Sequence, residues 1–126
     1  MTKEKQLQLL EETITYYTEN PLRRCIDNDG CYYSGDRNKL SESDGCAIGR
    51  LIPNELALEL DKQGQLGVEE IFEDLPIEIQ VYGNDFLNKL QSLHDSKSFW
   101  DADGLTENGK IFIENFKLRI KTNGFI

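Results

Sequence analysis

The chain has 126 residues, with 23 acidic against 14 basic side chains and a formal net charge of −9. This length corresponds to one domain, and a hydrophobic content of 38% supports a modest core, which argues against a fully disordered chain. The excess of carboxylates repels phosphate backbones, so nucleic acid is not expected as a partner. No apolar run approaches the roughly 18–20 residues that a membrane span needs.

The N-terminal residues Met1–Lys5 lead into an amphipathic pattern and not into the continuous apolar stretch of a signal peptide. We therefore expect a soluble cytoplasmic protein. The three cysteines, Cys25, Cys31 and Cys46, are an odd number in a chain with no export signal. This argues against a disulfide framework.

The first predicted element is an amphipathic helix of about four turns that closes before Pro21. Its apolar positions recur at spacings of three and four residues and are Leu7, Leu10, Ile14 and Tyr17. The turn residues Asp27–Gly30 then predict a β-hairpin within residues 22–34. Turn chemistry explains these residues better than a calcium loop, because the register of an EF-hand is not met. The polar stretch 35–45 predicts a flexible surface loop.

The middle of the chain predicts short helices that must pack on the rest. The apolar stretch Cys46–Ile52 predicts a buried turn or two of helix, and Asn54 is the expected N-cap of the next helix. A further short helix has its apolar face at Val68, Ile71, Phe72 and Leu75. The segment Ile77–Val81 alternates with a strand-like period of two, although Pro76 could equally open a helical turn, and both readings stay open.

The last third predicts two helices joined by a loop. Gly83 and Asn84 start a helix whose apolar stripe is Phe86, Leu87, Leu90 and Leu93. A loop over 96–104 follows, and Thr106 can cap a final helix that stops at Gly124. The apolar set of that final helix is Ile111, Phe112, Ile113, Phe116 and Ile120. We expect an α+β fold, mainly α, in which about four to six helices, several of them short, pack with one small β-hairpin in a single domain over residues 1–126.

The residues with the clearest chemistry are Cys46, His94 and Asp95. Cys46 follows a glycine and opens a short helix, where unpaired N–H groups and the helix dipole favour a thiolate. His94 is the only histidine, and with Asp95 it could serve as the base for a thiol nucleophile. The structural alternative is a buried cysteine and a histidine that caps the end of its helix.

Metal and ligand binding have weaker support in the sequence. Cys31, Cys46 and His94, with Cys25, could supply soft ligands for structural zinc, but no pair has the close spacing of a zinc motif. No cofactor motif is present, so no cofactor is expected. Arg50 could bind an anion, or form a salt bridge with one of the many carboxylates.

Trp100 could likewise have a binding role or a structural role. An exposed indole would offer a binding platform, whereas a buried one would close the core.

Two blocks of the chain carry a resemblance to a known group of proteins. From Cys31 through the block Cys46–Pro53, and again over Phe86–Asp95 followed by Trp100, the chain resembles a family of small proteins without an established activity found in bacteriophages, prophages and bacterial genomes. The chain departs from the family in a long insert, Asp36–Asp44. The resemblance implies a small intracellular accessory protein. It also implies that Cys31, Cys46, Gln91, His94, Asp95 and Trp100 are the positions of interest.

Three functional hypotheses follow as expectations. The preferred hypothesis is a non-enzymatic accessory protein, associated with phage or other mobile elements, that binds a host macromolecule, most simply a protein. The alternative is a thiol hydrolase or transferase in which Cys46 attacks, His94 accepts the proton, and Asp95 or Gln91 orients the site. A structural zinc-binding module is a further alternative.

Overall fold

The computed structural model describes residues 2–19, 26–27, 30–31, 47–63, 67–96, 98–101 and 103–122. Within them the α-helices are α1 (Lys3–Glu19), α2 (Asn54–Lys62), α3 (Val68–Ile71), α4 (Ile77–Gln80), α5 (Asn84–Asp95) and α6 (Glu107–Thr122). Two short 3₁₀ helices accompany them, η2 (Gly49–Leu51) and η3 (Phe72–Asp74). The predicted α+β, mainly α class is confirmed. The predicted loop over 35–45 and the stop at Gly124 lie outside the described residues.

The strands form two antiparallel pairs. In the first, β1 (Ile26–Asp27) pairs with β2 (Gly30–Cys31), with Ile26 opposite Cys31, which is the hairpin that the turn residues predict. In the second, β3 (Trp100–Asp101) pairs with β4 (Gly104–Leu105). This second hairpin corrects the prediction of a plain loop over 96–104. Its turn is closed by the Asp103 N–H, which donates to the Asp101 carboxylate at 2.8 Å, and Gly104 takes a φ of 120°.

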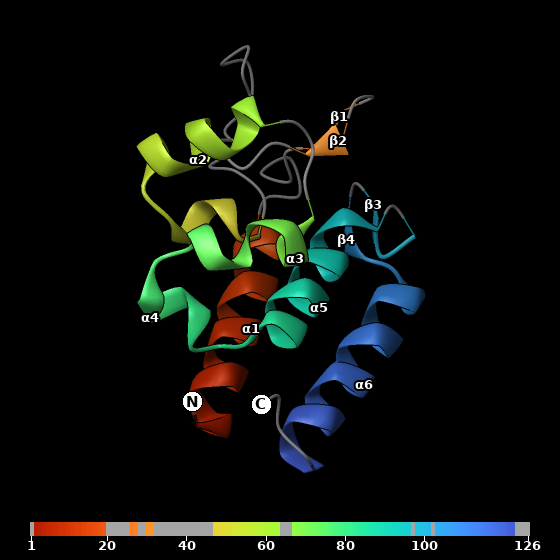
Figure 1. Ribbon diagram of the computed structural model, residues 1–126. Coiled ribbons are helices and arrows are strands. Elements are labelled where there is room, and N and C mark those ends of the chain that lie inside the picture. The colour runs from red at the N-terminus through yellow and green to blue at the C-terminus, as the bar shows by residue number, and fades with distance from the viewer. Residues whose placement is uncertain are drawn as a thin grey trace.

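Three long helices, α1, α5 and α6, form the body of the molecule, and α6 contacts α5 (Figure 1). The helices α1 and α6 also contact each other, and Lys117 of α6 pairs with Glu11 of α1. The short helices α2, α3 and α4 lie on the opposite side of α5 from α6 (Figure 1). The exposed side of the short helices and that of α6 are therefore well separated.

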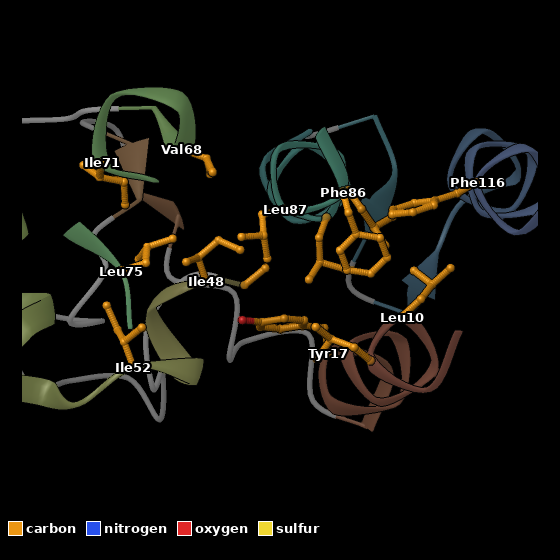
Figure 2. Packing of buried hydrophobic residues seen from close by; sticks show 14 of the residues in the cluster. Leu10, Tyr17, Ile48, Ile52, Val68, Ile71, Leu75, Phe86, Leu87 and Phe116 are labelled. Carbon is orange, nitrogen blue, oxygen red and sulfur yellow. The ribbon is translucent and has the colours of Figure 1, made fainter. Parts of the chain in front are cut away.

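The hydrophobic core joins these two sides. Figure 2 shows Ile52, Ile71 and Leu75 at one end and Phe86, Phe116 and Leu10 at the other, with Ile48 and Leu87 between them. All four stripe positions of α5, Phe86, Leu87, Leu90 and Leu93, are fully buried, as their spacing predicts.

The segment whose secondary structure stayed open is helical. Pro76 occupies the N-cap of α4, and the Ile79 and Gln80 N–H groups donate to its carbonyl at 2.9 and 3.0 Å. The prediction of an Asn54 cap is wrong, because Pro53 holds the extended N-cap conformation and the helix begins at Asn54. The buried turn predicted around Cys46–Ile52 is present as η2, with Ala47 and Ile48 fully buried.

The apolar set of α6 needs one correction. Ile111, predicted to be in the core, is 57% exposed, and Gly109 lies on the buried side with Ile113, Phe116 and Ile120. Gly109 permits this rotation, because a Cβ there would lie 2.3 Å from the Phe99 carbonyl oxygen. The helix therefore approaches the β3–β4 hairpin closely along its glycine. In the described part of the chain, no helix is long and apolar enough to span a membrane.

Candidate functional site

The C-terminal half of α5 carries three of the residues with predicted chemistry. His94 lies fully buried, and its Nδ1 atom is 2.8 Å from the Asp95 Oδ1 atom. Because a carboxylate only accepts hydrogen bonds, this contact assigns the proton of the ring to Nδ1 when the imidazole is neutral. The Asp95 side chain is 48% exposed. Asp95 therefore orients the imidazole from the surface of the protein.

Gln91 connects this pair to the block that begins at Cys46. Its Nε2 atom donates to Asp95 Oδ1 at 2.9 Å, and its Oε1 atom accepts from the Ile48 N–H at 3.3 Å. Gln91 and Asp95 are four residues apart on one helix, which brings their side chains to the same face. We call Gln91, His94 and Asp95, with the Ile48 N–H, the polar network.

One aromatic ring contacts the imidazole, and a second aromatic ring contacts the first. Tyr17 of α1 meets His94 edge-on at 5.0 Å between ring centres, and meets Trp100 at 6.2 Å. Trp100 is only 4% exposed, and its indole N–H donates to the Leu93 carbonyl at 2.8 Å. The structure therefore places Trp100 in the core, and its indole N–H serves an internal hydrogen bond.

The remaining predicted site residues are placed only in part. Cys46 and Cys25 lie outside the described residues, and so do the side chains of Cys31 and Arg50. The distance between Cys46 and His94 therefore stays untested, as does the zinc set Cys31, Cys46 and His94. Among the residues that are described, no group of three or more His, Cys, Asp or Glu side chains is placed to hold a metal ion.

Sequence reasoning identified Gln91, His94 and Asp95 but not their partners. The spacing of Gln91 and Asp95 was a readable signal, because residues four apart meet on a helix. Tyr17 and the Ile48 N–H had no such signal, since both come from distant segments and join the network only through tertiary packing.

A second feature lies on the surface of the short helices. Ile77 is 70% and Val81 49% exposed, although both are large aliphatic side chains. Between Lys62 and Lys89 the chain has no lysine or arginine but has six carboxylates, all exposed. We call these exposed residues, in or beside α3, η3, α4 and the start of α5, the acidic face; they are Ile77 and Val81 with Glu69, Glu70, Glu73, Asp74, Glu78 and Asp85.

The acidic face is held in a defined shape by its own polar contacts. The Gln80 amide donates to the Glu73 and Leu75 carbonyls at 3.2 and 2.7 Å, which ties α4 to η3. Glu69 of α3 accepts from the Asn88 amide of α5 at 3.2 Å. These hydrogen bonds fix the position of α4, which carries Ile77 and is followed directly by Val81.

The acidic character extends to α1. Burial, and then the negative charge of Glu12, raise the pKa of the Tyr82 hydroxyl above its ordinary value. The Tyr82 ring stacks on the Phe86 ring, with 5.5 Å between the ring centres. A carboxylate of α1 therefore acts on the residue that follows Val81.

Comparisons with models of known protein families, with curated proteins and with solved structures found no match. The resemblance to phage and prophage proteins stays a prediction.

Proposed function

We propose that this protein is a non-catalytic binding module whose acidic face binds a basic surface of another macromolecule, most simply a host protein. The observation that carries the proposal is the exposure of Ile77 and Val81 among six carboxylates in a stretch without a single basic residue. Interfaces typically combine an apolar centre with a polar rim. The rim charges here select a cationic partner.

The carboxylates of the acidic face are expected to contribute more to the recognition of a partner than to the affinity for it. Carboxylates around an interface steer an oppositely charged partner to the correct face and raise the association rate. The aliphatic side chains supply the area that is removed from water. A partner with an apolar anchor among lysines or arginines satisfies both requirements.

The burial and the hydrogen bonds of the predicted catalytic residues also favour a binding function over catalysis. His94 is fully buried, and Gln91 and Asp95 are hydrogen-bonded to each other. A general base must reach the proton that it removes. The contacts of the imidazole include the Asp95 carboxylate and the Tyr17 ring, and its full burial is typical of a packing residue.

The proposal can be tested by capture from a host lysate at low and moderate salt. The immobilised protein should retain a basic protein, and an Ile77→Ser/Val81→Ser variant should lose it. Leu58→Ser is the matched control, because Leu58 is an aliphatic residue of α2 that is 45% exposed and belongs to neither the acidic face nor α6. The proposal fails if wild type retains nothing above an empty support, or if the α4 variant retains the same protein as well as wild type does.

A thiol enzyme is the second candidate, and one observation favours it. Asp95 orients His94 through Nδ1, and Gln91 joins the same carboxylate to the backbone two residues after Cys46. This candidate requires Cys46 to react with a thiol alkylator much faster than Cys25 at neutral pH, and His94→Ala to slow that reaction. Equal or slower labelling of Cys46 would exclude it.

A further inference from the structure

The outer side of α6 carries a regular row of residues opposite the buried side. Ile113, Phe116 and Ile120 face the core, and the residues on the far side are spaced alternately by four and three positions. We call this row the α6 stripe; it comprises Glu107, Ile111, Glu114, Leu118 and Lys121. Its two aliphatic members, Ile111 and Leu118, are 57% and 63% exposed.

When two copies of the stripe run in opposite directions, they match at the aliphatic positions and at both charged ends, while the two Glu114 side chains face each other at the centre. Ile111 and Leu118 are seven residues apart, so they lie on one line along the helix. In an antiparallel pair, Ile111 of each helix meets Leu118 of the other. The acidic start of the stripe, at Glu107, then faces the basic end, at Lys121. A parallel pair would place like charges together at all three charged positions of the stripe, whereas an antiparallel pair does so only at Glu114. The charges therefore favour the antiparallel arrangement.

The surroundings of the stripe extend the apolar contact. A groove of about 620 Å³ lies between α1 and α6 and is lined by six polar or charged residues together with Ile14, Leu105, Ile113 and Leu118. Leu118 thus belongs to both the stripe and the groove. An aliphatic side chain of a second helix that packs on Leu118 also covers the edge of this groove.

We propose that the α6 stripe is the interface of an antiparallel homodimer, in which Ile111 of one copy packs on Leu118 of the other. This interface is distinct from the acidic face, because α4 and α6 lie on opposite sides of α5 (Figure 1). The dimer therefore displays two acidic faces at once. A partner with two basic sites gains from the increased effective concentration of the second contact.

Sedimentation velocity over a range of concentrations tests the dimer directly. Wild type should shift from monomer to dimer, and Leu118→Asp should weaken the dimer at least about tenfold, because a carboxylate then replaces the buried aliphatic group. Ile77→Asp is the matched control and should leave the dimer unchanged. A wild-type chain that stays monomeric at about 1 mM overturns the proposal, and so does a dimer that Leu118→Asp leaves intact.

A charge exchange tests the direction of the two helices. Glu107→Lys should weaken the dimer, because it opposes the Lys121 of the second copy. Adding Lys121→Glu to the same chain should restore it. Melting curves of both variants verify that the monomer stays folded. If the double variant is as weak as the single variant, the antiparallel arrangement is wrong. These tests measure mass alone, so they succeed or fail independently of the partner of the acidic face.

Discussion

His94 of α5 and Ile77 of α4 lie on consecutive helices. The polar side chain is buried and the apolar one is exposed, which is the opposite of what their polarities favour. The imidazole is fully buried, whereas the isoleucine is 70% exposed. The buried ring has Asp95 at Nδ1 and Tyr17 against its edge, so the fold provides for its polarity. Nothing described around Ile77 compensates in the same way for its exposure. The burial of His94 shows that the polar network is part of the core, whereas the exposure of Ile77 is the feature on which the proposed binding function rests.

The largest expected effect is at the buried side of this comparison. His94→Ala removes a fully enclosed ring and leaves a cavity beside Tyr17, so we expect a loss of about 3 kcal/mol in the free energy of unfolding. Ile77→Ala should change it by less than about 0.5 kcal/mol. Urea unfolding of both variants measures the difference. A loss below about 1 kcal/mol for His94→Ala would show that the polar network is not structural.

The next effect concerns the close approach of α6 to the second hairpin. Alanine normally stabilises a helix relative to glycine. At Gly109, however, the added Cβ would lie 2.3 Å from the Phe99 carbonyl oxygen and 2.8 Å from the Leu105 side chain. We expect Gly109→Ala to destabilise by about 2 kcal/mol.

The exposed neighbour Asn108 is the control for this substitution. Asn108→Ala should be neutral or slightly stabilising, because only helix propensity changes there. Thermal unfolding should show a lowered midpoint for Gly109→Ala and an unchanged or slightly raised midpoint for Asn108→Ala. A stabilising Gly109→Ala would contradict the position of α6.

A smaller effect is expected at the hydrogen bond that joins the network to η2. Gln91→Ala removes the acceptor of the Ile48 N–H and a donor to Asp95, which should cost about 1 kcal/mol. Ser92→Ala, at the exposed neighbour, should cost less than about 0.5 kcal/mol. Hydrogen exchange at the Ile48 amide should accelerate in the first variant and stay slow in the second. Unchanged exchange would argue against the bond.

The smallest effect is a pH dependence at the edge of the acidic face. Burial, and then Glu12, raise the pKa of Tyr82, so the folded state holds the phenolic proton more tightly than the unfolded state. The stability from this group is complete below the ordinary pKa of about 10 and is lost as the pH rises through the raised pKa. Urea unfolding across this range should show the loss in wild type and less of it in Tyr82→Phe. Identical profiles would refute this origin.

The elements that the sequence predicted well have a single unambiguous pattern. The apolar residues of α5 form a single face, and all four of them, Phe86, Leu87, Leu90 and Leu93, are buried. By contrast, Ile111, Phe112 and Ile113 are consecutive, so the sequence alone does not decide which of them faces the core. The close contact at Gly109 decides it, and that contact depends on a hairpin of two-residue strands that carries almost no sequence signal.

The candidate site was predictable only where it is local. Gln91, His94 and Asp95 share one helix, and their spacing indicates that they can interact. The burial of His94 depends on Tyr17 from the opposite end of the chain, and no local pattern reports that contact. The acidic face needed both kinds of information, because the charges are visible in the sequence while the exposure of Ile77 is not.

The contact between α1 and α6 has a consequence for the order of events during synthesis. The Lys3 ammonium donates to the Lys121 carbonyl, and Glu11 pairs with Lys117. The helix α1 therefore packs against α6, which is synthesised much later. When α1 leaves the ribosome, the helix that covers its side is still untranslated. The apolar side of α1, including Leu10, must wait until α6 emerges. The apolar side of α1 therefore stays exposed in the nascent chain until α6 has been synthesised.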